Sequence, residues 1–317
     1  MGAINKVIVL GATGDQGLPL MDQLMAAGYQ VTAAARRPDA FAGTRFAPVG
    51  VVAAELDDEE SLVRAFDGQD ALAMHLPFEF DRARASAFGQ RIASAAARAG
   101  VGKIVFHTSC YVADHDLGLS AHDGRRDIEN HIEASGVPFV IVRSAVFMDN
   151  MIRVWTKPAI VEKGVFAYPA DETMRISWIC LDDVAAYMVC ALGRDELTAE
   201  RVLVGGPEAL TGDEVAARLE RVIGKPIRFE SLSPDAYAIK MSLLVTGSAD
   251  VEPHSLYDRI AEFYRWYNAQ PVSPLAVDLA PALAKLPIRP TTLAQWAARK
   301  DWTTTADEGA LRSMGME

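Results

Sequence analysis

The stretch Lys6–Gly28, KVIVLGATGDQGLPLMDQLMAAG, decides the fold. A β-branched run of strand length leads into the turn GATGDQG, and apolar residues at helical spacing follow the turn. Glycines in such a turn allow a tight bend and bring backbone amides close to a pyrophosphate at the helix N-terminus. The spacing G-x-x-G-x-x-G differs from the more familiar G-x-G-x-x-G, but the flanking strand and helix make the motif specific. The candidate phosphate-binding residues are Gly11, Thr13, Gly14, Asp15, Gln16 and Gly17.

The alternation of strands and helices continues through the first half of the chain. Short β-branched runs predict strands at Lys6–Leu10, Gln30–Ala35, Gly50–Ala54, Ala71–Leu76, Lys103–His107 and Pro138–Arg143. Segments with helical periodicity lie between these runs, and they end at glycines suited to a left-handed cap. The pattern predicts an α/β protein with a doubly wound parallel sheet of the Rossmann type and right-handed crossovers.

The alternation loosens after about residue 150. We expect residues 1–150 to form a nucleotide-binding Rossmann domain. Residues 151–317 are expected to form a smaller α+β lobe that covers the carboxyl edge of the sheet and binds the substrate. A helix and a strand near residues 181–206 are predicted to return to the sheet. Thr211 and Glu214 predict a capping box at the start of a helix that Gly224 ends.

The end of the second predicted strand indicates which dinucleotide would bind. An acidic residue there suits a free ribose 2′-hydroxyl, whereas arginine suits a 2′-phosphate. The strand QVTAAA ends at Arg36 and Arg37, and the first carboxylate, Asp39, comes only after Pro38. We therefore expect the Rossmann domain to bind NADP(H) rather than NAD(H). The alternative is that the two arginines form only a solvated turn.

Composition and charge exclude several classes of protein. The 317 residues include 31 basic and 42 acidic side chains, and the resulting net charge of −11 opposes binding to nucleic acid. Apolar runs stay below the roughly 18 residues of a membrane span, and the first residues lack the pattern of a signal peptide. Cys110, Cys180 and Cys190 show no zinc-ligand spacing. We expect a cytoplasmic protein without a metal that acts on a small apolar or aromatic substrate, and a homodimer is compatible with the sequence.

Seven stretches, in order along most of the chain, resemble the NmrA-like group of atypical short-chain dehydrogenase/reductases, which includes quinone, isoflavone and triphenylmethane reductases. They are GATGDQG, VTAAARRP, AELDDEESLVRAFDGQDAL, KIVFHTS, IEASGVPFVIVRSAVFMDNM, ISWICLDDVAAYMVCAL and GGPEALTGDEVAARL. The resemblance implies that Glu55 and Leu56 border the adenine and that Leu76 and Pro77 face the nicotinamide. It also implies that Asn150 lies at the rim of the substrate cleft.

The sequence departs from this group in the residues that carry the chemistry. Short-chain dehydrogenases commonly use a serine together with a Tyr-x-x-x-Lys pair, in which the phenol passes a proton to a carbonyl oxygen. Ser109 matches the serine, but the Tyr-x-x-x-Lys pair is absent. Arg125 stands where the family often has its lysine, and a shift by one residue pairs His122 with Arg126. His122 is a candidate acid and Arg125 or Arg126 a candidate ribose contact. The alternative for His122 is a polar, exposed residue in a loop before a helix.

The sequence is compatible with two functions for a protein that binds this dinucleotide. Without a relay acid, the sequence favours an NADPH-dependent reductase that passes hydride directly to a conjugated or polarised acceptor, such as a quinone, an enone or an imine. The alternative is a catalytically silent NADP(H)-binding redox sensor. An aromatic cluster at mostly helical spacing is interpreted as core packing, with a wall of the substrate pocket as the alternative. It consists of Tyr257, Phe263, Tyr264, Trp266 and Tyr267.

Overall fold

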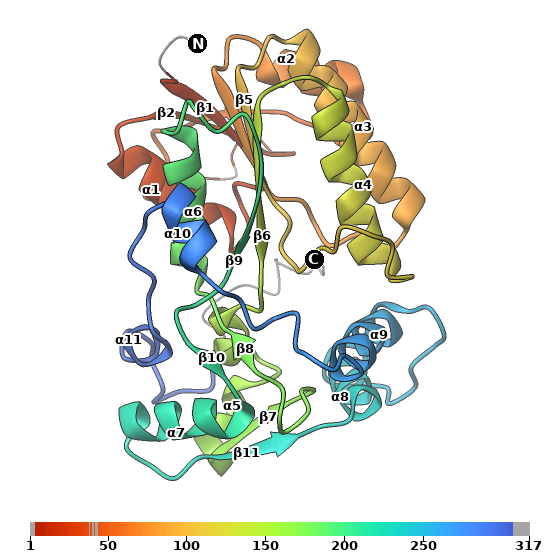
Figure 1. The fold of residues 1–317 in the computed structure, drawn as a ribbon, viewed down its shortest axis with the longest axis vertical. Coiled ribbons are helices and arrows are strands. Elements are labelled where there is room, and N and C mark those ends of the chain that lie inside the picture. Colours follow the sequence, from red (N-terminus) through yellow and green to blue (C-terminus); the bar gives the residue numbers. More distant parts are fainter. Residues whose placement is uncertain (1–3, 38, 40, 42–43, 307–317) are drawn as a thin grey trace.

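The computed structural model of this protein describes residues 4–37, 39, 41 and 44–306. Pro38, which follows the arginine pair, lies outside the described residues. Figure 1 shows a larger lobe built on a sheet and a smaller lobe below it, at one end of the strands. Within the described residues, no helix combines the length and the apolar character that crossing a bilayer requires.

The larger lobe is built on a seven-stranded sheet whose neighbouring strands are all parallel. The strand order is β3-β2-β1-β4-β5-β6-β9. The bounds are β1 Lys6–Leu10, β2 Gln30–Ala34, β3 Gly50–Val52, β4 Ala71–Met74, β5 Lys103–His107, β6 Phe139–Ser144 and β9 Ala199–Val204. Every residue of β4, β5 and β6 is buried, as expected for a parallel sheet covered on both faces. The predicted doubly wound parallel sheet is confirmed.

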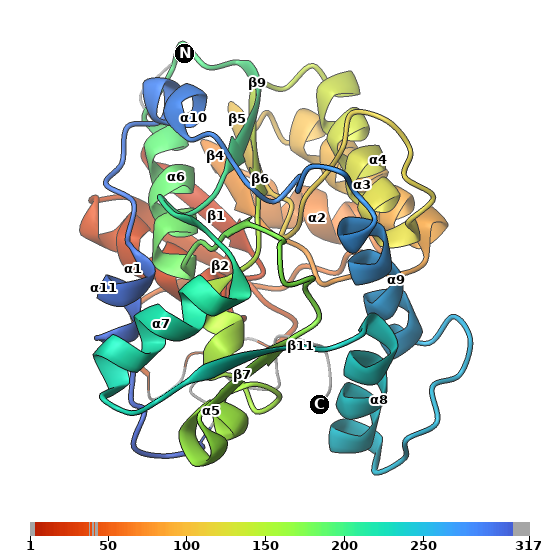
Figure 2. The same ribbon diagram turned by 60° about the horizontal axis from the view of Figure 1, so that its bottom comes forward.

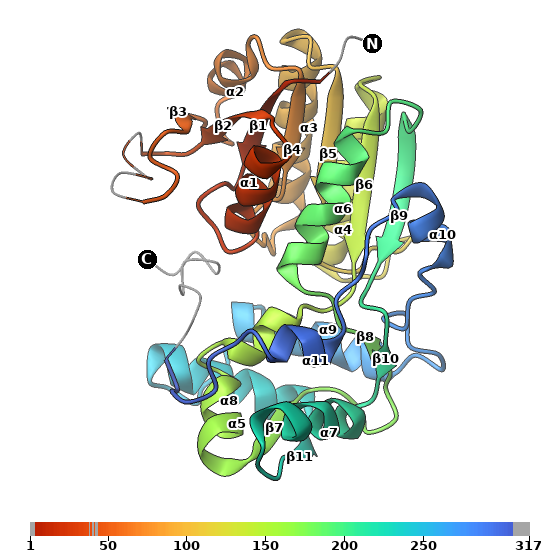
Figure 3. The same ribbon diagram turned by 90° about the vertical axis from the view of Figure 1, so that its left-hand side faces the viewer.

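Helices cover both faces of the sheet. Figure 3 shows α1 (Gly17–Ala26) and α6 (Leu181–Leu192) on one face, with α10 (Ala280–Lys285) beside β9. The other face is covered by α2 (Glu59–Phe66), α3 (Arg82–Arg98) and α4 (Ser120–Ala134). The strand order reverses between β1 and β4. In open α/β sheets, ligands bind beyond the carboxyl ends of the strands at such a switch point.

The smaller lobe packs its own apolar core beyond the carboxyl ends of the strands. It contains the strand pairs β7–β11 and β8–β10 and several helices, of which α8 and α9 lie side by side at one edge (Figure 2). The predicted capping box of α7 is present, because the Thr211 and Glu214 side chains each bond the other's backbone N–H. The bounds are η1 Met148–Ile152, α5 Lys157–Lys163, β7 Val165–Tyr168, β8 Ile176–Ser177, β10 Ala209–Leu210, α7 Gly212–Ile223, β11 Arg228–Ser231, α8 Pro234–Thr246, α9 Leu256–Asn268 and α11 Leu293–Ala297.

Candidate functional site

The glycine loop between β1 and α1 needs its glycines for two different reasons. Gly11 has φ +83°, and a Cβ atom on Gly17 would lie 2.2 Å from the Gly11 carbonyl oxygen, so the loop backbone itself excludes side chains there. A Cβ atom on Gly14 would meet no protein atom closer than 3.6 Å. The space beside Gly14 is therefore not filled by other protein atoms. Such a cradle, at the N-terminus of α1, fits the diphosphate of a dinucleotide.

Gln16 ties this loop to the carboxyl ends of the central strands. Its Oε1 atom accepts hydrogen bonds from Ser109 Oγ at 2.9 Å and from His107 Nδ1 at 2.8 Å. Burial lowers the pKa of His107 well below its usual value, so the imidazole is neutral and carries its proton on Nδ1. His107 Nε2 then accepts a bond from Ser144 Oγ at 2.9 Å. Ser109, the predicted site serine, belongs to this series of hydrogen bonds, and its backbone has φ +64°.

The loop also contacts the smaller lobe through an ion pair. Arg153 Nη2 lies 2.6 Å from Asp15 Oδ2, and both side chains are largely buried. A buried carboxylate without a counter-ion would repel the phosphates of a ligand, and Arg153 compensates its charge. Thr13, also predicted at this loop, is exposed. Arg153 follows η1 in the smaller lobe, and no local sequence pattern links it to Asp15.

The arginine pair lies at the carboxyl end of β2. Arg36 and Arg37 are exposed, and neither forms an ion pair within the described part of the chain. The amide of Ala35 donates to the carbonyl of Val52 at 3.0 Å, which keeps the ends of β2 and β3 side by side. Glu55, which is exposed, and Leu56, which is half-buried, follow β3. The residues predicted near the ribose and the adenine thus share one edge of the sheet.

The structure places His122 inside a helix, and not in an exposed loop before it. α4 begins at Ser120, and His122 belongs to the helix with 1% of its surface exposed, so the exposed-loop alternative is wrong. The reason is Asp123, whose carboxylate accepts the backbone N–H groups of Leu117 and Gly118 and folds the preceding loop over the helix start.

The two arginines of α4 lie in different environments. His122 and Arg125 are three residues apart and share the buried face of the helix, whereas Arg126 is turned by about 100° from Arg125. Arg125 Nη2 donates to the carbonyl oxygens of Leu76 at 2.9 Å and Pro77 at 2.7 Å. Arg126 instead pairs with Asp116 near the surface. The structure brings His122, Arg125, Leu76 and Pro77 together and leaves Arg126 outside this group.

A buried ion-pair network fixes α4 to the sheet. The carboxylate of Glu129, which has no exposed surface, accepts bonds from Arg143 Nε at 3.0 Å, Arg143 Nη2 at 2.7 Å and Arg201 Nε at 3.0 Å. Arg143 belongs to β6 and Arg201 to β9. Bidentate arginine pairs restrict the orientation of both partners, so the position of His122 on the same helix is well defined.

A cavity of about 280 Å³ lies between the two lobes. Its volume is close to the lower end of the range typical of ligand pockets. None of the described residues that line it is Asp, Glu, Lys or Arg. The larger lobe contributes Gln16, Pro77, Phe78, Phe80, Ser109, Cys110, Tyr111 and His122. The smaller-lobe side contributes Ala145, Val146, Phe147, Asn150, Trp155, Tyr237, Met241, Leu256, Ile260, Phe263, Tyr264, Tyr267 and Leu275. Of the aromatic cluster, Phe263, Tyr264 and Tyr267 line this cavity and also pack in the apolar core, whereas Tyr257 and Trp266 pack in the core without lining the cavity.

Titratable groups around the cavity are held neutral. Burial, with the nearby Arg125 cation as a second cause, lowers the pKa of His122 to about 3 and that of His75 to about 4. Burial raises the pKa of the Cys110 thiol to about 12, so this cysteine stays protonated. His122 Nε2 lies 2.7 Å from the Tyr267 hydroxyl. His75 was not anticipated from the sequence, although its place directly after β4 puts it at the switch point.

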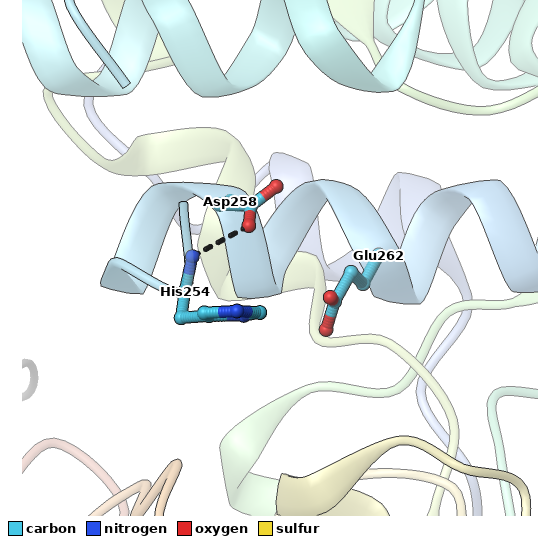
Figure 4. Close-up of side chains that lie close together, drawn as sticks. All are labelled: His254, Asp258 and Glu262. Atoms are coloured by element: carbon cyan, nitrogen blue, oxygen red, sulfur yellow. Dashed lines mark hydrogen bonds between the residues drawn. The ribbon is translucent and has the colours of Figure 1, made fainter. Parts of the chain in front are cut away.

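A metal-capable cluster lies at the N-terminal end of α9 and in the residues just before it. His254, Asp258 and Glu262 place potential ligand atoms within 4.8 Å of one another. Figure 4 shows the Asp258 carboxylate turned toward the backbone amide of His254. The carboxylate accepts a hydrogen bond from this amide at 2.7 Å. Arg265 pairs with Asp258 at 3.1 Å and Arg259 with Glu262 at 2.9 Å. These arginines already neutralise both carboxylates, so the cluster offers a cation little free negative charge.

Known proteins with related sequences include two named reductases. The chain is 37% identical over 235 residues to a (4-alkanoyl-5-oxo-2,5-dihydrofuran-3-yl)methyl phosphate reductase of Streptomyces griseus, covering 73% of this chain and 78% of that protein. It is 29% identical over 259 residues to an NAD(P)H azoreductase of Xenophilus azovorans, covering 81% of this chain and 86% of that protein.

Solved structures share the fold. The crystal structure of an NADPH-dependent quinone oxidoreductase of Escherichia coli, complexed with NADPH, superposes with a TM-score of 0.75 at 23% identity and covers 92% of this chain and 98% of that one. The sequence profile of the NmrA-like family matches residues 4–297, nearly the whole chain and both lobes. The glycine loop, the parallel sheet and the smaller lobe all lie within this match, and the chain belongs to the NmrA-like family.

Proposed function

We propose that this protein is an NADPH-dependent reductase that passes hydride to a small, uncharged, conjugated or polarised acceptor, such as a quinone, an enone or an imine. The observation that carries the proposal is the cavity, because no Asp, Glu, Lys or Arg occurs among its described lining residues, and because it shares Gln16 and Ser109 with the chain of hydrogen bonds that reaches the glycine loop. An acceptor in such a cavity would lie next to the nicotinamide end of a dinucleotide held at that loop.

The cofactor assignment depends on both ends of the dinucleotide. Gly14 leaves the space that a diphosphate needs, and Arg36 and Arg37 offer guanidinium groups for a ribose 2′-phosphate. The names of the relatives agree with this assignment, since the azoreductase is an NAD(P)H enzyme and the quinone oxidoreductase was solved with NADPH. When bound, NADPH supplies the hydride.

The residues of the chain would then bind and orient the cofactor and the acceptor, and they would exclude water from the cavity. Arg125 fixes the carbonyls of Leu76 and Pro77, the segment proposed to face the nicotinamide, and Gln16 holds Ser109 at the same end of the cavity. Aromatic side chains from α8 and α9 line the cavity and would pack against the faces of a planar acceptor. Quinones and enones accept hydride first and a proton from water later, and an imine that reacts as its iminium ion already carries the proton, so the absence of a Tyr-x-x-x-Lys pair is no obstacle. Arg126 has no part in this mechanism.

The composition of the described cavity wall also bears on which acceptors can bind. The Streptomyces griseus relative is named for a substrate that carries a phosphate ester. Burying a dianionic phosphate among aromatic and aliphatic side chains is costly without a paired cation. Arg125, the buried cation nearby, does not line the cavity and donates its Nη2 hydrogens to the carbonyls of Leu76 and Pro77. We therefore expect this protein to reduce an uncharged enone with a higher kcat/KM than the phosphate ester of the same enone.

A panel of acceptors tests the proposal. NADPH oxidation is followed at 340 nm with 1,4-naphthoquinone, an alkyl-substituted butenolide, an imine and an aldehyde, and turnover of at least one of the first three is expected. Phe263→Asp, which places a carboxylate in the cavity wall, is expected to abolish turnover while NADPH binding is retained. Tight NADPH binding without turnover of any acceptor would overturn the reductase and favour the redox sensor.

A further inference from the structure

A histidine–tyrosine pair lies in the cavity wall. His122, from α4, and Tyr267, from α9, are 145 residues apart in sequence, and their Nε2 and hydroxyl oxygen atoms lie 2.7 Å apart. Both residues are buried, with 1% and 5% of their surfaces exposed, and both line the cavity. No other hydrogen-bond partner of the Tyr267 hydroxyl occurs among the residues that the structure describes. The function of the pair depends on which atom holds the proton between them.

The other ring nitrogen of His122 decides the direction of this hydrogen bond. Nδ1 is buried and has no hydrogen-bond partner within the described chain. A neutral imidazole carries one N–H, which would be an orphaned buried donor at Nδ1 but a satisfied donor at Nε2. Orphaned buried N–H groups are rarer than under-satisfied acceptors, and the nearby Arg125 cation also favours a lone pair over an N–H at Nδ1. His122 Nε2–H therefore donates to the Tyr267 oxygen.

This direction leaves the hydrogen of the Tyr267 hydroxyl free for an acceptor in the cavity. We propose that Tyr267 donates a hydrogen bond to the acceptor oxygen on which negative charge develops during reduction, and that His122 is its positioning residue. The inference rests on the proposed function and adds a catalytic residue to it. Hydrogen-bond donors aimed at a developing oxyanion are among the largest contributions to enzyme catalysis.

The step is balanced for an enone. The β-carbon gains hydride, a new C–H bond forms, the C=C π bond breaks, and the electron pair moves onto the carbonyl oxygen. The resulting enolate oxygen accepts the hydrogen bond from Tyr267 and is protonated afterwards by water, while NADPH is oxidised. Burial raises the pKa of the Tyr267 phenol well above its usual value, so the phenol donates a hydrogen bond and keeps its proton. Arg125, which has no ion pair among the described residues, adds positive charge nearby.

Substitution of Tyr267 by phenylalanine tests the proposal with little change in packing. For 1,4-naphthoquinone, or for the most active carbonyl acceptor of the panel, Tyr267→Phe is expected to lower kcat on the order of 100-fold with the Kd for NADPH unchanged. Tyr257→Phe is the matched control, because Tyr257 is a buried tyrosine of the same helix that does not line the cavity. Loss of activity in Tyr264→Phe but not in Tyr267→Phe would overturn the assignment.

Two further variants separate positioning from chemistry. His122→Ala removes the donor that fixes the phenol and is expected to lower kcat by roughly 3- to 10-fold, well short of the 100-fold or more expected for a proton donor. His122→Gln retains an N–H donor and is expected to recover most of this loss. A pH–rate profile that changes between His122→Gln and the unaltered protein would mean that the imidazole itself transfers a proton, and the proposal would be wrong.

A binding measurement keeps the inference testable without turnover. The planar probe 4-nitrophenol resembles an enolate when ionised, and its absorbance near 400 nm reports the phenolate form. Bound to the protein saturated with NADP⁺, it is expected to shift toward the phenolate, and Tyr267→Phe is expected to abolish that shift. A shift that is equal in both proteins would refute the oxyanion role. A Tyr267-dependent shift without turnover of any acceptor would keep this role and overturn only the proposed function.

Discussion

The two ends of the proposed site are built in different ways. The glycine-loop end consists of main chain, glycines and exposed arginines, and the residues proposed to hold the phosphates all come from the first 37 residues of the chain. The cavity end consists of aromatic and aliphatic side chains from distant elements, without an acidic side chain, lysine or arginine among the described lining residues. The first end suits the fixed charges of a dinucleotide, and the second suits the shape of an uncharged acceptor. Acceptor preference can therefore diverge while the dinucleotide end is kept.

The largest effect is expected at Gly14. In Gly14→Val the new side chain has room within the protein but occupies the proposed diphosphate cradle, so the fold is retained and NADPH binding is lost. Losing two charge-assisted hydrogen bonds at about 1.5–3 kcal/mol each raises the Kd by roughly 10²- to 10⁴-fold. Calorimetry measures the affinity and circular dichroism the fold.

Gly17→Val is the contrasting control for this prediction. Its Cβ atom would lie 2.2 Å from the Gly11 carbonyl oxygen, so we expect this variant to lower the thermal midpoint as well as the affinity. A Gly14→Val protein that binds NADPH as tightly as before would remove the glycine loop from the site.

Arg36→Asp tests the charge at the dinucleotide end. Replacing a guanidinium that contacts the 2′-phosphate is expected to cost about 1.5–3 kcal/mol, or one to two decades in affinity for NADPH, with little loss for NADH. Arg221→Asp changes the net charge equally on the exposed surface of α7 and is expected to leave both affinities unchanged. Equal affinities for NADPH and NADH in the unaltered protein would contradict the assignment.

The pH dependence of stability tests the cavity end. The pKa of His122 is about 3 in the folded protein, below the 6.5 of an unperturbed histidine, so the unfolded chain binds its proton first as the pH falls. This contribution to stability is complete above pH 6.5 and declines as the pH falls toward 3, by about 2 kcal/mol at pH 5. Urea unfolding at pH 7 and pH 5 measures the decline.

His122→Gln supplies the control for this measurement. The amide keeps a donor for Tyr267 but does not titrate in this range, so about 2 kcal/mol of the loss at pH 5 is expected to disappear. His75, with a folded pKa of about 4, retains its own share of the pH dependence. An unchanged difference between the two pH values in His122→Gln would mean that His122 is not held neutral by burial.

The smallest effect is expected at the ion pair that joins the two ends. Arg153→Met removes the guanidinium partner of the Asp15 carboxylate beside the proposed diphosphate cradle, and the Kd for NADPH is expected to rise about tenfold. Adding Asp15→Asn removes the offending charge and is expected to restore most of the affinity. Additive effects of the two substitutions in a double-mutant cycle would show that this ion pair does not act on the dinucleotide end.

The sequence by itself determined the features that depend on neighbouring residues. The strand Lys6–Leu10, the turn GATGDQG and the helix after it are adjacent in sequence, so local sterics and hydrophobic period were sufficient to predict the unit. The positions of Arg36 and Arg37 followed in the same way from the end of β2. The residues of α4 were only partly predictable, because the helix start depends on two hydrogen bonds that Asp123 accepts from a loop without a sequence signature.

Only the tertiary structure decided which distant side chains meet. Tyr267 reaches His122 across 145 residues, and Gln16 reaches His107 across 91 residues, and neither contact leaves a local pattern. The same aromatic spacing on α9 suits a buried core or a pocket wall, since both place apolar residues on one helix face. The difference arises from the space that packing leaves between the lobes, which gives Phe263, Tyr264 and Tyr267 a cavity to line. Local propensity cannot encode that space, because it is set by the volumes of side chains from both lobes.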